Sequence, residues 1–141
     1  MHRRQFLALA PALILAPALP LRAEDPIRLR DLYNKDLSFS DLALARQGQL
    51  LAVQGFMAPP LKANSVFFVL TNRPMAVCPF CEPGMPWPDD ILAVYARRIV
   101  EVEPFNVPIL VEGRLELGDA TDPELGFYSK VRLREATFRR A

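Results

Sequence analysis

The chain has 141 residues, which is enough for one compact domain and too few for two. Its single histidine is His2, and the first 23 residues contain three arginines, Arg3, Arg4 and Arg22, and no acidic residue. Without that segment the chain has 14 basic and 16 acidic side chains, a net charge of about −2, and no histidine. This composition excludes Ser-His-Asp triads, Cys-His pairs, histidine zinc ligands and c-type haem attachment. It also argues against a protein that gathers nucleic acid or anionic lipid by its overall charge.

Residues 1–23 have the features of a signal peptide. A basic start is followed by an apolar stretch that ends at Leu21, and the small residue Ala23 precedes a polar boundary. The stretch is shorter than the ~20 residues of a membrane-spanning helix and contains three prolines. The Arg3-Arg4 pair, followed by Gln-Phe-Leu, resembles the twin-arginine export motif, with an ordinary Sec signal as the alternative. We therefore predict cleavage after Ala23 and a periplasmic protein whose mature chain has no transmembrane segment.

Residues 24–47 are predicted to form an arm that precedes the main domain. Their apolar side chains have no sustained period, so the pattern predicts a loosely ordered segment with at most one short strand. The Ser40-Asp41 pair is an exception, because serine at such a position typically caps the start of a helix. We expect a short helix from there to Arg46, ended by Gly48.

Residues 48–141 carry strand signals and no pattern of a long helix. The segment 107–117 alternates apolar and polar side chains, which places one face in a core and the other in water. The last strand changes the parity of its apolar residues at Ala136, which predicts a β-bulge. The predicted strands are 50–57, 66–71, 91–97, 107–117 and 128–138, the last two forming a hairpin around a turn at 118–126.

Five strands without a long helix indicate a small all-β domain. We predict a five-stranded antiparallel OB-like barrel, with a small sandwich as the alternative. Gly55 and Gly113 lie inside predicted strands, as expected where strands bend tightly at barrel corners. The segment 97–107 is too short and too interrupted by proline for the helix that many OB-folds insert at this place.

Residues 72–90 form the one segment with reactive side chains. Five prolines make it a stiff, irregular loop between two predicted strands, and such loops often carry function. Apart from Met57, it contains all the sulfur of the mature chain: the thiols of Cys78 and Cys81 and the thioethers of Met75 and Met85.

The Cys78-Pro79-Phe80-Cys81 sequence has three interpretations, of which the first two are a catalytic dithiol and a closed disulfide. The spacing resembles thioredoxin-type active sites, but their chemistry needs a thiolate of lowered pKa, normally at a helix N-terminus. Prolines after Cys81 oppose such a helix, and Glu82 adds a negative charge. A closed disulfide fits an oxidising compartment, although so small a ring stabilises the fold by only about 2 kcal/mol.

The third interpretation is a soft-metal site. Two thiolates three residues apart form a half-site for copper(I) or zinc, and Met75 and Met85 supply thioethers suited to copper(I). Because the mature chain has no histidine, a closed zinc site needs carboxylates or cysteines of a second subunit. Under this interpretation the metal ligands are Cys78, Cys81, Met75 and Met85, and the metal is copper(I) or zinc. No other cofactor is predicted.

Four motifs follow one another between residues 48 and 138. They are Gly55-Phe56-Met57-Ala58-Pro59, Phe67-Phe68-Val69-Leu70, the Cys-Pro-Phe-Cys sequence and the hairpin that begins Val107-Pro108-Ile109. This succession resembles an uncharacterised family of small exported bacterial OB-like domains. Members of that family are similar to proteins encoded beside transporters that respond to metal. The resemblance therefore implies a metal-handling accessory role.

Several other polar and aromatic residues are assigned structural roles. Trp87 is expected to cap the barrel end, with an exposed recognition aromatic as the alternative, and Met57 to pack near the barrel mouth. Asp89 and Asp90 are predicted to be solvated charges rather than an acid/base pair. A row of cations on the last strand is predicted to form a solvated basic face and not a nucleic-acid site: Lys130, Arg132, Arg134, Arg139 and Arg140.

The sequence thus predicts a periplasmic, non-catalytic binding or accessory module, linked to metal transport or homeostasis. Its loop would bind a soft metal or a periplasmic partner such as a transporter component, and no nucleic acid. The alternatives are a thiol-disulfide exchange enzyme that uses Cys78 and Cys81, and an interaction domain with a structural disulfide. The predicted boundaries are 1–23 for the signal peptide, 24–47 for the arm and 48–141 for the barrel.

Overall fold

A computed structural model describes residues 25–77, 87–88 and 90–141 of the chain. The predicted signal peptide lies outside the described residues, as do Cys78, Cys81, Met85 and Asp89. The described part is mostly β, with a 3-10 helix and a short α-helix ahead of five strands. The elements are η1 (Leu29–Leu32), α1 (Asp41–Arg46), β1 (Leu50–Met57), β2 (Phe67–Thr71), β3 (Ile91–Ala96), β4 (Pro108–Thr121) and β5 (Tyr128–Arg140).

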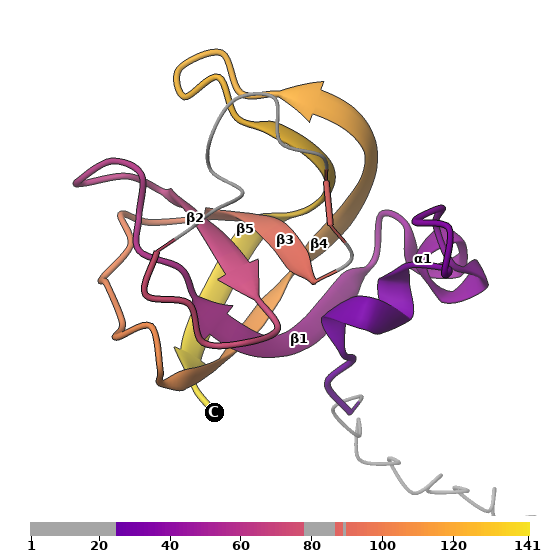
Figure 1. The fold of residues 1–141 in the computed structure, drawn as a ribbon, viewed down its shortest axis with the longest axis horizontal. Coiled ribbons are helices and arrows are strands. Elements are labelled where there is room, and N and C mark those ends of the chain that lie inside the picture. Colours follow the sequence, from indigo (N-terminus) through magenta and orange to yellow (C-terminus); the bar gives the residue numbers. More distant parts are fainter. Residues whose placement is uncertain (1–24, 78–86, 89) are drawn as a thin grey trace, which may run out of the picture.

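The five strands form one sheet of mixed orientation (Figure 1). β1 pairs with β2 on one side and with β4 on the other, so the order β1-β2-β3-β5-β4 closes into a ring. Four pairings are antiparallel, but β3 and β5 run parallel. The prediction of a wholly antiparallel sheet is therefore wrong at this pairing. The reason is geometric, because a closed ring with an odd number of strands cannot alternate in direction all the way round.

The predicted strands are confirmed with small shifts at their ends. β1 spans the predicted residues, whereas β2 and β3 each lack one predicted terminal residue. β4 and β5 run further than predicted, since Ala120 pairs with Ser129 and Ile109 with Arg140. The β4–β5 hairpin is consequently the longest ladder of the sheet, and it carries most of the polar contacts described below.

The two predicted bends occur where glycine permits a close approach between strands. A Cβ atom at Gly55 would lie 2.7 Å from the carbonyl oxygen of Thr71, and one at Gly113 would lie 2.9 Å from a β5 side chain. Beside Gly113 the register between β4 and β5 shifts, and Glu135 has a φ of 51°. The bulge predicted near Ala136 is therefore confirmed.

The arm contains the predicted helix but is more closely packed than its pattern indicated. The Ser40 hydroxyl accepts a hydrogen bond from the Ala43 amide at 3.1 Å, which caps α1 as predicted. The prediction of a loosely ordered arm is wrong for η1, because Leu29 and Leu32 are completely buried in the core. The Ile27 amide also donates to a β1 carbonyl. A single 3-10 turn places its apolar residues three apart, a spacing too short to register as a sustained period.

The hydrophobic core fills the ring of strands and continues beneath the arm. Phe67 and Phe68 of β2 are almost fully buried, together with Met57 at the end of β1, as predicted for that methionine. Within the described ranges, no helix is both long and apolar enough to cross a membrane.

Candidate functional site

The two ends of the sulfur-rich segment 72–90 are joined where β2 ends and β3 begins. The Asn72 amide donates to the carbonyl oxygen of Asp90 at 2.9 Å, next to the last β2–β3 pair. The Arg73 guanidinium forms an ion pair with the Asp90 carboxylate at 3.2 Å. Asp90 is buried, so the prediction that it is a solvated charge is wrong. Its carboxylate is retained inside because Arg73 neutralises it.

Thr71 makes the first of these ends continuous with β2. It is buried as the last residue of that strand, and its hydroxyl donates to the carbonyl oxygen of Arg73 at 2.8 Å. This bond spans the bend that the chain makes at residues 72–73 as it leaves the strand. The segment thus departs from a rigid, hydrogen-bonded position rather than from a frayed strand end.

Trp87 anchors the returning part of the segment in the core. Its indole nitrogen donates to the Tyr33 hydroxyl at 2.8 Å, and that hydroxyl donates to the carbonyl oxygen of Ile91 at 3.1 Å. The indole also packs edge-on against Phe127 at 6.1 Å between ring centroids, and only 6% of Trp87 is exposed. The expectation of a buried, capping tryptophan is confirmed, and the alternative of an exposed recognition aromatic is wrong.

These contacts define an anchored base, which consists of Thr71, Arg73, Trp87 and Asp90 with the arm residue Tyr33. Sequence reasoning missed this arrangement because it depends on Tyr33, 58 residues away from its partner Ile91. Of the four predicted metal ligands, only Met75 is described, and it is half-buried near the base. Among the described residues no three His, Cys, Asp or Glu side chains gather in a way that could hold a metal ion.

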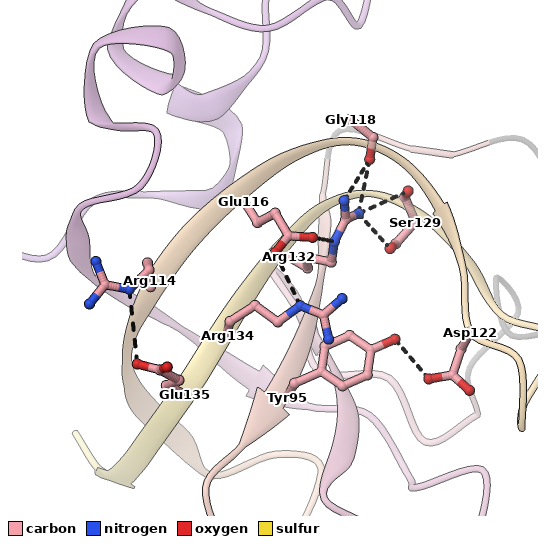
Figure 2. Close-up of polar contacts among 9 residues, drawn as sticks. All are labelled: Tyr95, Arg114, Glu116, Gly118, Asp122, Ser129, Arg132, Arg134 and Glu135. Atoms are coloured by element: carbon pink, nitrogen blue, oxygen red, sulfur yellow. Dashed lines mark hydrogen bonds and ion pairs between the residues drawn. The ribbon is translucent and has the colours of Figure 1, made fainter.

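The row of cations on β5 forms the predicted solvated face only in part, since Arg139 and Arg140 are exposed but Arg132 is not. Arg132 is 3% exposed, and its guanidinium contacts Glu116 at 2.6 Å, the carbonyl oxygen of Gly118 at 2.9 Å and the Ser129 hydroxyl at 3.0 Å (Figure 2). The prediction is wrong here because β4 places Glu116 directly opposite Arg132. The alternating pattern predicts that the Arg132 side chain is solvated, but its charge is instead neutralised by Glu116 on the neighbouring strand.

Arg134 extends this cluster toward β3. Its guanidinium contacts the other oxygen of Glu116 at 3.2 Å and lies 4.3 Å from the centre of the Tyr95 ring (Figure 2). The Tyr95 hydroxyl donates to the Asp122 carboxylate at 3.0 Å. Burial and this hydrogen bond raise the pKa of Tyr95 to about 12. Burial alone would raise the pKa of Glu116, but hydrogen bonds from Arg132 and Arg134 outweigh it and lower that pKa.

The arginine cluster is therefore occupied by its own partners. Glu116 forms ion pairs with both Arg132 and Arg134. The Asp122 carboxylate interacts electrostatically with Arg134, and Tyr95 covers the face of that guanidinium. A group that binds a ligand needs free hydrogen-bonding capacity, whereas all three guanidinium nitrogens of Arg132 already donate within the hairpin. We assign the cluster to the stability of the β4–β5 hairpin and not to ligand binding.

Comparison with solved structures identifies a similar fold in a crystal structure, at 2.45 Å resolution, of a DUF3299 family protein from Pseudomonas aeruginosa. The TM-score is 0.54, the two sequences are 19% identical, and the match covers 84% of this chain and 98% of the other. At this identity the likeness extends to the fold and no further. No protein-family model matches the chain, and no curated protein matches it in sequence.

Proposed function

We propose that the protein is an exported, non-catalytic accessory module whose ring of strands is an OB-like barrel. In this proposal the sulfur-rich segment binds a soft metal, copper(I) or zinc, through Cys78, Cys81, Met75 and Met85. The observation that supports it is the anchored base, which holds both ends of the segment at one place on the sheet.

A fixed base favours metal binding because it lowers the conformational entropy that a loop loses when its ligands converge. Met75 lies two residues beyond Arg73 and is half-buried. Cys78 and Cys81 follow within a few residues in a stretch stiffened by proline. Thiolates and thioethers together form the donor set that copper(I) prefers.

The described flanks give less support to thiol-disulfide exchange. Such chemistry needs a cation or a helix N-terminus beside the attacking thiol to lower its pKa. In the described parts of the segment, 72–77, 87–88 and 90, there is no helix, and the one cation, Arg73, is paired with Asp90. An interaction domain with a structural disulfide is the remaining alternative, and the experiment below separates all three.

Metal content is the deciding measurement. The protein is purified from a reducing cytoplasm with its thiols protected, and bound copper and zinc are measured by mass spectrometry. We expect about one metal per chain, and almost none in a Cys78→Ser/Cys81→Ser variant, because a soft metal is bound mainly by thiolate.

Met57→Leu is the matched control, since it removes the one sulfur of the mature chain outside the segment. This variant should retain the metal. Equally low metal in the wild-type and cysteine variants would reject the proposal. Insulin reductase activity in the metal-free protein would then favour the exchange enzyme. A protein that has no such activity, and whose fold is unchanged after reduction, would reject both the exchange enzyme and the structural disulfide.

A further inference from the structure

A cleft of about 410 Å³ lies at the opposite end of β3 from the sulfur-rich segment. One wall is residues 97–103, which we call the strap, and the other is the end of β5 from Ala136 to Arg139. The strap begins the connection from β3 to β4, where the sequence predicts no helix, and this connection is non-helical (Figure 1). A cleft of this size is large enough to hold several side chains of a ligand.

β5 has a free edge along this cleft. It pairs with β4 as far as Arg140, but its pairing with β3 ends at Ala136. The Ala136 carbonyl oxygen accepts from the Arg97 amide, whereas the Ala141 amide donates to β4. Since backbone groups alternate in direction along a strand, those of Phe138 and Arg140 point away from β4. Throughout the described residues, nothing pairs with them on that side.

The strap does not close this edge. Beyond Arg97 none of its described backbone groups bonds to β5, and the Val100 amide donates instead to the carbonyl oxygen of Ser65. Most strap residues line the cleft, and one of them, Ile99, is 60% exposed. Within the described parts of the chain, polar contacts join the two walls at the ends of the cleft, between Arg97 and β5 and in the Arg140–Glu103 ion pair at 2.9 Å.

The charge of the cleft is predominantly positive. Arg97, Arg98 and Arg139 line it together with Glu101 and Glu103. Glu103 is already neutralised by Arg140, which leaves one carboxylate against three guanidinium groups. No ion pair involves Arg98 or Arg139 among the described residues. An occupant with acidic side chains therefore complements the cleft, whereas a basic segment such as the chain's own leader does not.

We propose that an extended, acidic peptide segment of a partner protein binds in this cleft and adds a strand to the free edge of β5. Its backbone pairs with Phe138 and Arg140, its acidic side chains meet Arg98 and Arg139, and apolar side chains lie against Ile99. This site is separate from the metal-binding proposal, because the two lie at opposite ends of β3.

The probe is a fluorescein-labelled octapeptide of alternating valine and glutamate, followed by fluorescence anisotropy. We expect saturable binding that an Arg98→Glu/Arg139→Glu variant weakens at least about tenfold, because two charge-assisted contacts become repulsive. An Arg30→Glu/Lys35→Glu variant makes the same change in charge at two exposed positions of the arm and should bind as the wild type does. Cys78→Ser/Cys81→Ser should also leave peptide binding unchanged, which separates this proposal from the metal site.

Hydrogen exchange tests the added strand itself. The amides of Phe138 and Arg140 should exchange rapidly in the free protein and slowly with peptide bound, while those of Thr137 and Arg139 stay slow in both. Binding weaker than about 1 mM, equal binding of a valine–lysine peptide, or no protection of Phe138 would overturn the proposal. Dimerisation of the protein through this edge would also overturn it, by identifying a second copy as the occupant.

Discussion

β5 holds its arginines in two contrasting environments. Near its start, Arg132 lies opposite Glu116 and beside β3, and its guanidinium is buried with every contact made within the hairpin. Near its end, Arg139 lies opposite Leu110, where β3 has already ended and a cleft opens. Arginine on the same strand thus stabilises the hairpin at position 132 and lies open to a ligand at position 139. The neighbouring strands decide between the two roles.

The largest expected effect is the loss of the buried guanidinium. Arg132→Ala should lower the free energy of unfolding by about 2–3 kcal/mol, because Gly118 and Ser129 lose their donor inside the hairpin. Arg139→Ala should change it by no more than about 0.5 kcal/mol. Urea unfolding of both variants tests the contrast, and similar losses for the two would abolish it.

A smaller effect is expected for the carboxylate that joins the two cluster arginines. Glu116→Gln should cost about 1 kcal/mol at neutral pH, since Glu116 is partly exposed and solvent screens its ion pairs. The folded-state pKa of Glu116 is lowered, so its contribution is present above the unfolded pKa of about 4.3 and is lost as the pH falls through the folded value. The variant should therefore lose less stability on acidification than the wild type, which denaturant titrations at several pH values would show. An identical acid dependence would contradict the assignment.

The smallest effect concerns the alkaline limb of the stability profile, which is the fall in the free energy of unfolding as the pH rises above about 10. The pKa of Tyr95 is raised to about 12 in the folded protein, whereas an unfolded tyrosine ionises near 10. Its contribution is accordingly complete below pH 10 and disappears as the pH rises toward 12. Tyr95→Phe should flatten this limb, measured by thermal unfolding between pH 9 and about 12. Tyr128→Phe gives the comparison. Its hydrogen bond to Asp119 also raises the pKa of Tyr128, but Tyr128 is more exposed and lies outside the arginine cluster, so this variant should flatten the limb less.

Local features of the fold were predictable because short-range chemistry determines them. Ser40 caps α1 with its own hydroxyl, and β1 begins and ends at the predicted residues. The bulge near Ala136 was visible as a change of parity. These features depend on neighbours a few residues apart, and such contacts are encoded directly in the order of side chains.

The candidate site was predictable in part. The sulfur-rich segment was identified by composition alone, and the burial of Trp87 followed from its expected place at the barrel end. The contacts that anchor it were not, because the Tyr33 hydroxyl and the Arg73–Asp90 pair meet only after the arm and two strands have packed. The alternation of side chains likewise predicted that Arg132 faces outward but not that it is buried. A period of two indicates on which face of the sheet a side chain lies, and it does not indicate which residue lies opposite on the next strand.

By itself, the sequence determined that this is a small β-rich chain with one short helix, few catalytic options and its sulfur concentrated in one segment. Only the tertiary structure decided which charges are neutralised and which edges stay open. It did so by closing five strands into a ring, in which at least one neighbouring pair must run parallel. That pair is β3 and β5, and their pairing ends at Ala136. Pairing between distant strands determines the surroundings of each side chain, and that information resides in contacts between residues far apart in the chain.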